Sequence, residues 1–431
     1  MKRFFASSVI LVVLVFALGL TAAAQDDVTE VRFTCYQDGT ECEVYEDLLD
    51  RFMEENPDIS VVIDQVPYQD ILDSLPTNVQ VGEGPDIARI TNFPELTEFY
   101  LDLRPLMEDP SLMEDNFNPA VLDAFRPEGD DDGLYGFPDA LTVTAPFVNA
   151  TLFEQAGVEL LGEGATWEEW IDAMTEVAEA TGIDYVFAID NRGHRFAGPA
   201  MSMGATFFDE EGNFDLADDE GFATYAEMLK SWLDSGLSPR ETWASGDALV
   251  DARTFFSNAQ AVMYFSGSWQ VGGFADTIGD AFDWVVVPNP TGPGGSTGVA
   301  GGAGIVAFDP NDEEKAQTIA RVMEYLLQPE VYAEFSGRTL NIPAHAGAVE
   351  AGVEFQTDNE QVEAALNAFA QEAAKLQDQA LLLNIHPFAF AYYGSSNTRL
   401  QQYFAGEITL EEMLQRLQED IDDAVANAAE S

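Results

Sequence analysis

The chain has 431 residues and a mass of 47.1 kDa, a length that predicts two or three domains or one large one. It carries 77 acidic residues against 18 basic ones, for a formal net charge of −59 at pH 7. Nucleic acids and anionic membranes carry the same sign of charge, so this composition argues against both as partners. Salt shortens the range of self-repulsion, so we hypothesise adaptation to high salt; the alternative is an ordinary acidic protein.

The N-terminal segment, residues 1–24, has the pattern of a signal peptide. A basic start is followed by an apolar run over residues 9–20, and Ala22 and Ala24 form a cleavage motif. The run is shorter than a membrane span needs, and no cysteine stands at the cleavage point to carry a lipid. We therefore expect a periplasmic or secreted protein whose signal peptide is cleaved near Ala24.

The chain has only two cysteines, Cys35 and Cys42. In an oxidising compartment such a close pair is typical of a disulfide. A two-cysteine metal site would need further ligands, and all three histidines are distant in the sequence. We predict a disulfide that holds the loop after the first strand, and no bound metal.

The predicted elements then alternate between strands and helices. Residues 28–36 predict a strand, Thr40 and Glu43 predict a capping box at the start of a helix, and residues 59–66 predict a second strand. A strand, a helix and a strand at this spacing predict a βαβ unit with parallel pairing. A further strand is predicted over residues 87–90. The alternation continues, so we predict the α/β class.

Loops rich in glycine or aspartate interrupt this pattern. Residues 127–133 are a solvated acidic loop, and residues 288–304 are a glycine-rich crossover or a loop held close to a ligand. The first loop and residues 209–215 could each bind calcium, but solvation of the first loop and a hairpin turn in the second are the preferred interpretations. Thr409 and Glu412 predict a capping box for the last long helix.

The sequence contains none of the common nucleotide-binding, serine-hydrolase or metalloprotease motifs. Carboxylate pairs are so numerous that glycoside hydrolysis cannot be judged from residue types. The absence of motifs favours a binding protein over an enzyme, and we expect no cofactor and no catalytic residue.

Several short segments, in order along the chain, resemble the extracellular solute-binding proteins of ATP-binding-cassette importers, in the sugar-binding group that includes maltose-binding protein. The matching segments are FMEENPDI (52–59), GEGPDI (82–87), LYGFP (134–138), PFVNATLFEQAGV (146–158), TWEEW (166–170), QAVMY (260–264), GSW (267–269), YLLQPE (325–330) and NIP (341–343). The chain departs from the family pattern in two ways. The segment Phe147-Val148-Asn149 lacks the tyrosine that the family usually has before the asparagine. The lipidation cysteine is also missing.

The resemblance implies a two-lobe periplasmic-binding-protein type II fold, in which each lobe is a mixed sheet flanked by helices. On this basis the N-lobe covers 26–140 plus 299–350, and the C-lobe covers 141–298 plus 351–431. A carbohydrate ligand would bind in a cleft between the lobes, which close by hinge motion. The implied partner is the transmembrane permease of the importer, and the protein is expected to be a monomer that binds no nucleic acid.

A sugar has apolar C–H faces, which stack on aromatic rings, and hydroxyl groups, which need charged or amide partners. With the resemblance, this chemistry selects a set of expected ligand contacts. The set consists of Trp269, Tyr36, Asp38, Asn92, Phe93, Asp139, Arg195, Tyr392 and Tyr393. Trp269 follows the predicted strand 261–265, where the family places a stacking aromatic; its alternative is a buried core tryptophan.

The other expected contacts rest on position along the chain. Tyr36 and Asp38 follow the first strand, and Asn92 and Phe93 follow the strand 87–90. Asp139 lies near the first hinge, and either Tyr392 or Tyr393 matches the family's late aromatic contact, with core packing as the alternative. Arg195 belongs to the one basic cluster of the chain, residues 191–195, which would bind a ligand or pair with surplus carboxylates. Trp167 and Trp170 are expected in a lobe core.

Two alternative functions remain open at this point. The first is a binder of another solute, such as a polyamine, an amino-acid derivative or a glycerol phosphate ester, for which the basic cluster would bind the phosphate. The second is a secreted carbohydrate-active enzyme, which would need two carboxylates flanking the same cleft.

Overall fold

The first of two β-sheets combines strands from the beginning of the chain with one strand from its second half. The computed structural model describes residues 28–430, so the predicted signal peptide lies outside the described residues. In the order β2-β1-β3-β10-β4, the strands are β2 (Ile59–Gln65), β1 (Thr29–Cys35), β3 (Ile87–Ile90), β10 (Gly304–Ala307) and β4 (Gly136–Pro138). β1 runs parallel to β2 and β3, which confirms the predicted βαβ start, and β10 is antiparallel to both of its neighbours.

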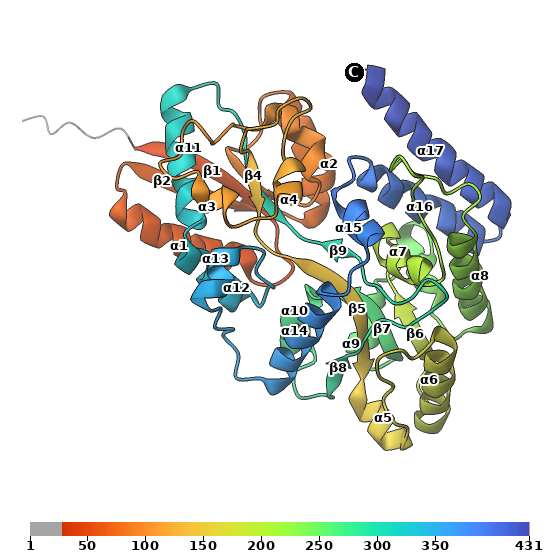
Figure 1. Ribbon diagram of the computed structural model, residues 1–431. Helices are drawn as coiled ribbons and strands as arrows, with labels where there is room; N and C mark the ends of the chain where they lie inside the picture. Colours follow the sequence, from red (N-terminus) through yellow and green to blue (C-terminus); the bar gives the residue numbers. More distant parts are fainter. Residues whose placement is uncertain (1–27, 431) are drawn as a thin grey trace, which may run out of the picture.

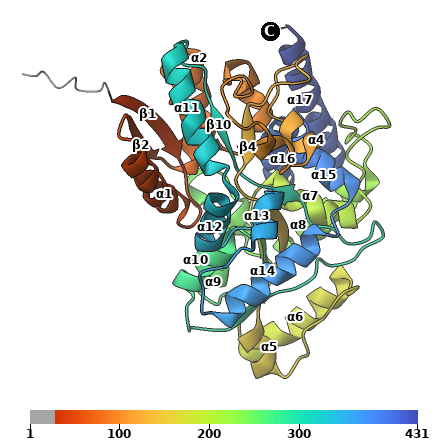
Figure 2. The same cartoon turned by 60° about the vertical axis from the view of Figure 1, so that its left-hand side comes forward.

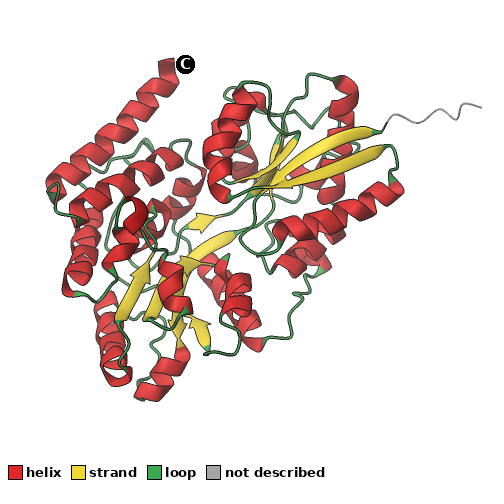
Figure 3. Ribbon diagram, turned by 180° about the vertical axis from the view of Figure 1, so that it is seen from behind, coloured by secondary structure: helices red, strands yellow, loops and turns green. Residues whose placement is uncertain are grey.

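The second sheet has the order β6-β7-β5-β8, and a short ninth strand pairs with the start of β5. Its strands are β6 (Tyr185–Ile189), β7 (Ala261–Gly267), β5 (Thr142–Asn149), β8 (Trp284–Val286) and β9 (Ala300–Gly301). β6 and β7 are parallel, whereas β7, β8 and β9 run antiparallel to β5. Figure 3 shows the two sheets as separate layers, each flanked by helices. The fold is therefore α/β with two mixed sheets, as predicted.

We call the first sheet with its helices the N-lobe and the second sheet with its helices the C-lobe (Figure 1). The N-lobe helices are α1 (Glu41–Glu55), α2 (Tyr68–Gln80), η1 (Phe93–Phe99), α3 (Ser111–Glu114), α4 (Pro119–Asp123), α11 (Glu313–Leu326), α12 (Pro329–Thr339) and α13 (Ala346–Ala351). The C-lobe helices are α5 (Ala150–Ala156), α6 (Trp167–Thr181), α7 (Gly193–Ser202), α8 (Glu220–Ser235), η2 (Arg240–Trp243), η3 (Gly246–Ala248), α9 (Ala252–Ser257), α10 (Gln270–Thr277), α14 (Glu360–Ala373), α15 (Asp378–Ile385), α16 (Ala389–Phe404) and α17 (Leu410–Glu430). The exact lobe boundaries drawn from the sequence stay a prediction.

Helices cover both faces of each sheet. Alternate side chains along a strand point to opposite faces, so neighbouring residues of one strand pack in different cores. In the N-lobe, Phe33 of β1 packs in a core with α1 and α11, whereas Ala88 of β3 packs in a second core with α2 and η1. In the C-lobe, Met263 of β7 joins a core with α6 and α8, and its neighbour Tyr264 joins a core with α9, α10 and α14. Each lobe thus has its own hydrophobic interior.

Helix α1 begins differently from the sequence prediction. Thr40 is its N-cap residue, but the Thr40 side chain makes no capping hydrogen bond, so the predicted capping box with Glu43 is wrong. Instead Oε2 of the buried Glu41 accepts hydrogen bonds from the backbone N–H groups of Asp38 and Gly39, at 3.0 and 2.9 Å. Glu41 thereby fixes the loop that leads into the helix.

Other local predictions are confirmed. Trp167 and Trp170 of α6 are buried in the C-lobe core. The capping box at the start of α17 forms, because the Thr409 backbone N–H donates to Glu412 and the Glu412 N–H donates to the Thr409 hydroxyl. Residues 209–215 form a turn in which the Asp209 carboxylate accepts backbone N–H groups.

The chain passes between the lobes three times. The first passage joins β4 to β5, the second joins β9 to β10, and the third joins α13 to α14 (Figures 1 and 2). At the second passage Gly302 has φ 153°, and a Cβ there would lie 2.3 Å from the Ala140 carbonyl oxygen of the first passage. The Leu141 N–H also donates to the Ile342 carbonyl at 2.9 Å. The first and second passages therefore pack against one another, and the loop between α12 and α13 is bonded to the first; together they form the hinge region.

Candidate functional site

The loop after β1 carries Tyr36 and Asp38 at the carboxyl end of the N-lobe sheet. The disulfide between Cys35 and Cys42 forms as predicted and closes this loop. Asp38 is exposed to solvent, yet the surrounding protein raises the pKa of its carboxyl to about 6, with a further contribution from the charge of Glu41. An exposed side chain that is nevertheless partly desolvated is typical of the wall of a cleft.

Beneath this loop lies a buried ion pair. Nε of Arg89 donates to Oδ2 of Asp139 at 2.7 Å, and Nη1 of Arg89 donates to the Tyr36 carbonyl at 3.1 Å. The Arg89 guanidinium also lies 4.4 Å from the centre of the Tyr36 ring, and the Tyr45 hydroxyl donates to Asp139 at 3.0 Å. Asp139 is 1% exposed, so the sequence prediction of a direct ligand contact does not fit; its carboxylate is used to hold the Arg89 side chain.

Two N-lobe side chains that the sequence analysis missed lie beside this loop. The Tyr68 ring is 4.8 Å from the Tyr36 ring, and the Tyr68 hydroxyl lies 2.9 Å from the Thr91 hydroxyl. Tyr68 is 36% exposed, whereas Tyr36 is only 3% exposed. The sequence did contain a signal for Tyr68, which follows β2. Because β1, β2 and β3 are parallel, the residues that follow these strands meet at one edge of the sheet. Tyr68 is therefore the accessible aromatic ring on this side.

On the C-lobe, the residues that follow β6 form the facing side of the site. The Tyr264 hydroxyl of β7 donates to Oδ2 of Asp190 at 2.7 Å. Burial raises the pKa of the Asp190 carboxyl to about 6, and the charge of Arg195 opposes this rise. Nε of Arg195 lies 3.9 Å from Oδ2 of Asp190, too far for a hydrogen bond. Asp190 was not predicted as a site residue.

Trp269 lies directly after β7 and is half-buried. Its six-membered ring lies against Gly267, where a Cβ would come within 2.0 Å of the ring, so only glycine leaves room for it. The Arg195 guanidinium lies over the Trp269 ring, 4.3 Å from the ring centre. Because β6 and β7 are parallel, the strands bring Arg195 and Trp269 to the same edge of the sheet. The Trp269 ring thus packs between the Arg195 guanidinium and the backbone at Gly267.

The His194 ring connects this cluster to the hinge. Nε2 of His194 lies 2.9 Å from the Ala300 carbonyl of β9, and Nδ1 lies 3.4 Å from Nη1 of Arg195. A carbonyl can only accept, so we assign the proton to Nε2. Burial, together with the charge of Arg195, lowers the pKa of His194 to about 3. The Tyr393 ring packs edge-on against His194, at 5.5 Å between ring centres.

Two further arginines accompany this cluster. Arg192 is exposed, and its side chain donates only to the Asn191 carbonyl, at 3.2 Å. Arg253 of α9 is half-buried and lies 5.5 Å from the centre of the Phe274 ring of α10. Within residues 28–430, neither guanidinium has a carboxylate within 4.0 Å. Arg253 lies 58 residues after Arg195 in the chain, and no motif around it indicated a site residue.

The side chains of the two lobes act on one another electrostatically. The charges of Arg195 and Arg253 lower the pKa of Asp38 and so partly offset the effect of burial. Burial raises the pKa of Tyr68, and the charges of Arg195 and Arg192 oppose this rise. The carboxyl edges of the two sheets therefore face each other, with Asp38 and Tyr68 on one side and the arginines with Trp269 on the other.

The remaining predicted residues lie outside this cluster or beneath it. Asn92 is half-buried and donates to Glu95 at 2.7 Å. Phe93 is 5% exposed and stacks on Phe125 in the N-lobe core, and Tyr392 is 0% exposed and donates to the Gly193 carbonyl. Core packing leaves Phe93 and Tyr392 no free face, so we do not carry them into the proposed site.

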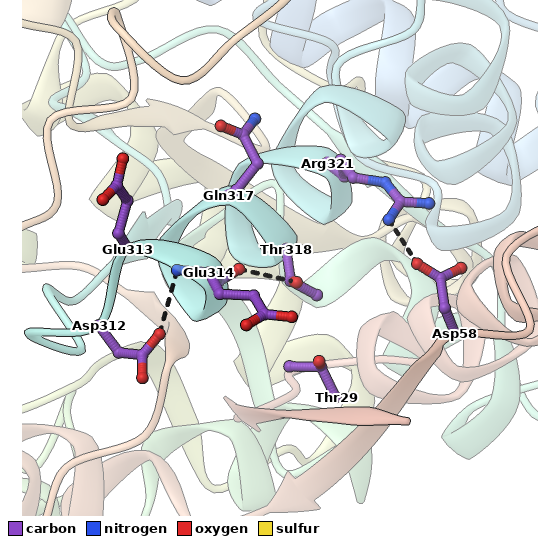
Figure 4. A pocket seen from close by; sticks show the side chains of 8 residues that line it. All are labelled: Thr29, Asp58, Asp312, Glu313, Glu314, Gln317, Thr318 and Arg321. Carbon is purple, nitrogen blue, oxygen red and sulfur yellow. Dashed lines mark hydrogen bonds and ion pairs between the residues drawn. The ribbon is translucent and has the colours of Figure 1, made fainter. Parts of the chain in front are cut away.

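A pocket of about 720 Å³ lies elsewhere, at the opposite edge of the N-lobe sheet (Figure 4). It is lined by Thr29, Asp58, Asp312, Glu313, Glu314, Gln317, Thr318 and Arg321. Three of its charged groups already have partners, since Asp312 caps α11 and Arg321 pairs with Asp58 at 2.7 Å. Among the described residues, no group of three potential metal ligands could hold an ion. We assign no function to this pocket.

Comparison with known proteins identifies the family. The model of the family described as bacterial extracellular solute-binding protein matches residues 47–364, about three quarters of the chain. The chain belongs to this family. Its members are extracellular, so the protein acts outside the cytoplasm; among residues 28–430, no helix is long and apolar enough to cross a membrane.

Individual relatives are distant but extend over most of the chain. A protein of Brucella abortus named as a binding protein is 24% identical over 349 residues, 79% of this chain and 82% of its own. The arabinooligosaccharide-binding protein of Halalkalibacterium halodurans is 24% identical over 315 residues, 68% of this chain and 67% of its own. A solved substrate-binding protein of Listeria monocytogenes in complex with cycloalternan has a TM-score of 0.77 at 18% identity, covering 93% of this chain and all of that one. This structural likeness shows the fold.

Proposed function

We propose that the protein captures a sugar or oligosaccharide between its two lobes and delivers it to the permease of an ABC importer. One relative described above is named for arabinooligosaccharide binding, and the solved substrate-binding protein of Listeria monocytogenes is in complex with cycloalternan. The facing edges of the two lobes supply the types of side chain that a saccharide requires.

The observation that carries this proposal is the placement of Trp269. Its indole lies at the carboxyl end of β7, half-buried, beneath the Arg195 guanidinium, whose charge acts on Asp38 and Tyr68 of the N-lobe. Tyr393, also half-buried, adds a second ring on the same side through its contact with His194. Flat rings beside charged side chains suit a ligand that has both C–H faces and hydroxyl groups. Asp38 provides acceptor atoms for hydroxyl groups.

The mechanism is a shift between open and closed forms. A ligand that contacts both lobes binds the closed form more tightly and so increases its population. The packed hinge, with Gly302 close to Ala140, is the region that absorbs this motion. The closed lobes then present a surface to the permease. The protein acts as a periplasmic or secreted monomer, after cleavage near Ala24, and carries out no reaction on its ligand.

A thermal-shift screen against neutral and charged saccharides, polyols, polyamines and glycerol phosphate tests this function. A ligand that binds only the folded protein raises the melting temperature by mass action. We expect a saccharide to raise it in a concentration-dependent manner, and titration calorimetry then gives the affinity.

Two substitutions of Trp269 separate binding from folding. Trp269→Ala removes the ring and should reduce affinity roughly 10- to 100-fold, whereas Trp269→Phe keeps a ring and should lose less. Both proteins should give a cooperative melt without ligand. Binding of a polyamine but of no saccharide, or hydrolysis of the saccharide by the wild-type protein, would contradict the proposal.

A further inference from the structure

The arginines at the gap differ from the other arginines of this chain. Every other arginine within residues 28–430 has a carboxylate within 3.7 Å. Arg192 and Arg253 have none within 4.0 Å, and the only carboxylate near Arg195 lies 3.9 Å from its Nε. In a chain with 77 acidic residues, a guanidinium without a carboxylate partner is unexpected. Three of them lie together on one edge of the C-lobe.

The Arg195 side chain is held in place, but not all of its N–H donors have a hydrogen-bond partner. Its guanidinium lies over Trp269 at 4.3 Å, and the neutral His194 ring lies 3.4 Å from Nη1. Its Nε is buried and has no hydrogen-bond partner. A buried donor without a partner costs free energy, and more so when it belongs to a charged group. Such a group is typical of a site that a ligand completes.

The charges of Arg192 and Arg253 act on the same N-lobe groups as that of Arg195: Arg253 acts on Asp38 and Arg192 acts on Tyr68. Arg192 directly precedes α7, the helix that carries Arg195. Arg253 lies against the first turns of α10, where a Cβ on Gly273 would come within 2.4 Å of its Nη2. α7 and α10 both begin at the site, so the partial positive charges of their N-termini add to those of the guanidinium groups.

The nearby carboxylates do not neutralise this cluster by direct pairing. Asp190 accepts from the Tyr264 hydroxyl and stays 3.9 Å from Arg195. Asp251 accepts from the backbone N–H of Arg253 as the N-cap of α9. Asp38 lies across the gap and forms no ion pair within 4.0 Å of these groups. The guanidinium donors thus stay free for an anionic ligand group.

We infer that the ligand is an acidic saccharide, in which an anionic oxygen group binds to Arg192, Arg195 and Arg253 of the C-lobe. The anionic group is a carboxylate, as in a uronic acid, or a sulfate or phosphate ester, because guanidinium donors fit the oxygen pairs of all three. The hydroxyl groups of the sugar would then face Asp38 and Tyr68 on the N-lobe. This inference rests on the proposed saccharide-binding function and makes it more specific.

Calorimetry with matched ligands tests the inference. The probes are trigalacturonate and its neutral methyl ester, with maltotriose, a sulfated disaccharide, glucose 6-phosphate and glycerol 3-phosphate as further arms. We expect at least one acidic saccharide to bind at least 10-fold more tightly than its neutral counterpart. The arm that binds best identifies which anionic group the site takes.

Charge-removing variants locate the anionic group. Arg192→Gln and Arg253→Gln should each reduce affinity for the acidic saccharide roughly 10- to 100-fold, since hydrogen bonds to charged groups are strong. Arg240→Gln is the matched control, because it removes the same charge from a C-lobe arginine that pairs with Asp234 at the surface. It should change affinity less than about twofold.

The outcomes separate the two proposals. If neutral and acidic saccharides bind equally and Arg192→Gln and Arg253→Gln bind like Arg240→Gln, saccharide binding stands and this inference is overturned. If glycerol 3-phosphate binds and no saccharide does, both proposals are wrong, because the arginines then serve a ligand that is not a sugar. If none of the saccharides binds, the proposed function fails and the inference fails with it.

Discussion

Two arginines, one in each lobe, have nearly the same aromatic contact and opposite electrostatic surroundings. The guanidinium of Arg89 lies 4.4 Å from the Tyr36 ring centre, and that of Arg195 lies 4.3 Å from the Trp269 ring centre. Arg89 also has Asp139 at 2.7 Å and is fully enclosed, whereas Arg195 has no hydrogen-bonded carboxylate. An arginine stacked on a ring is therefore a structural element in one lobe and a free donor in the other.

The largest expected difference between these two environments concerns stability. Asp139→Ala leaves the buried Arg89 charge without its hydrogen-bonded carboxylate and with only Glu41 at 4.0 Å, and this should lower the free energy of unfolding by about 3–5 kcal/mol. Arg195→Gln removes a charge whose carboxylate is 3.9 Å away and should cost less than about 1 kcal/mol. Urea denaturation of both variants measures the two values. Equal losses would mean that the two arginines have the same structural role.

The loops of the two lobes also differ in how they are held. A disulfide closes the N-lobe loop, whereas residues 190–195 of the C-lobe depend on hydrogen bonds and packing. Cys35→Ala with Cys42→Ala should lower the free energy of unfolding by about 2–3 kcal/mol, the value expected for so short a closed loop. Dithiothreitol should have a similar effect on the wild type and none on the double variant. A wild type that is insensitive to dithiothreitol would contradict this expectation.

A smaller effect should appear in the pH dependence of the C-lobe. The folded-state pKa of Asp190, about 6, is raised above the ordinary value of 3.8. The folded state therefore binds more protons than the unfolded state between these values, so the contribution of Asp190 to stability falls as pH rises through 6. Between pH 5 and pH 7 this contribution should amount to roughly 1 kcal/mol.

Asp190→Asn isolates this contribution from the many other carboxylates. The difference in unfolding free energy between wild type and Asp190→Asn should shift in favour of the wild type as the pH is lowered from 7 to 5. Asp234→Asn, at an exposed surface pair in the same lobe, is the control, because the lowered pKa of Asp234 predicts no such shift in this range. A pH-independent difference for Asp190→Asn would contradict the raised pKa.

Much of the fold could be predicted because its signals are local. Apolar spacing and turn residues located β1, α1, β2 and β3, and the oxidising compartment implied the disulfide. The capping of α1 was mispredicted since Thr40 and Glu43 have the right spacing, but the buried Glu41 already satisfies the N–H groups of Asp38 and Gly39. Salt adaptation stays a prediction from composition.

The candidate site was less predictable because it depends on contacts between distant segments. The order of strands brings Arg253 near Arg195 and places Tyr68 beside Tyr36, and no local pattern encodes either contact. The same limit explains why Phe93 was chosen from its position after a strand, although its ring faces the N-lobe core. Position after a strand predicts the edge of a sheet, but not the direction of a side chain.

The contact between His194 and the Ala300 carbonyl has a consequence for transport under changing acidity. The imidazole joins Arg195 to the strand that leads into the second passage between the lobes. With a pKa of about 3 it keeps the same single proton in neutral and in mildly acidic surroundings. This link between Arg195 and β9 therefore keeps its protonation when the environment of the cell acidifies, whereas the carboxyl groups of Asp38 and Asp190 beside it take up protons near pH 6.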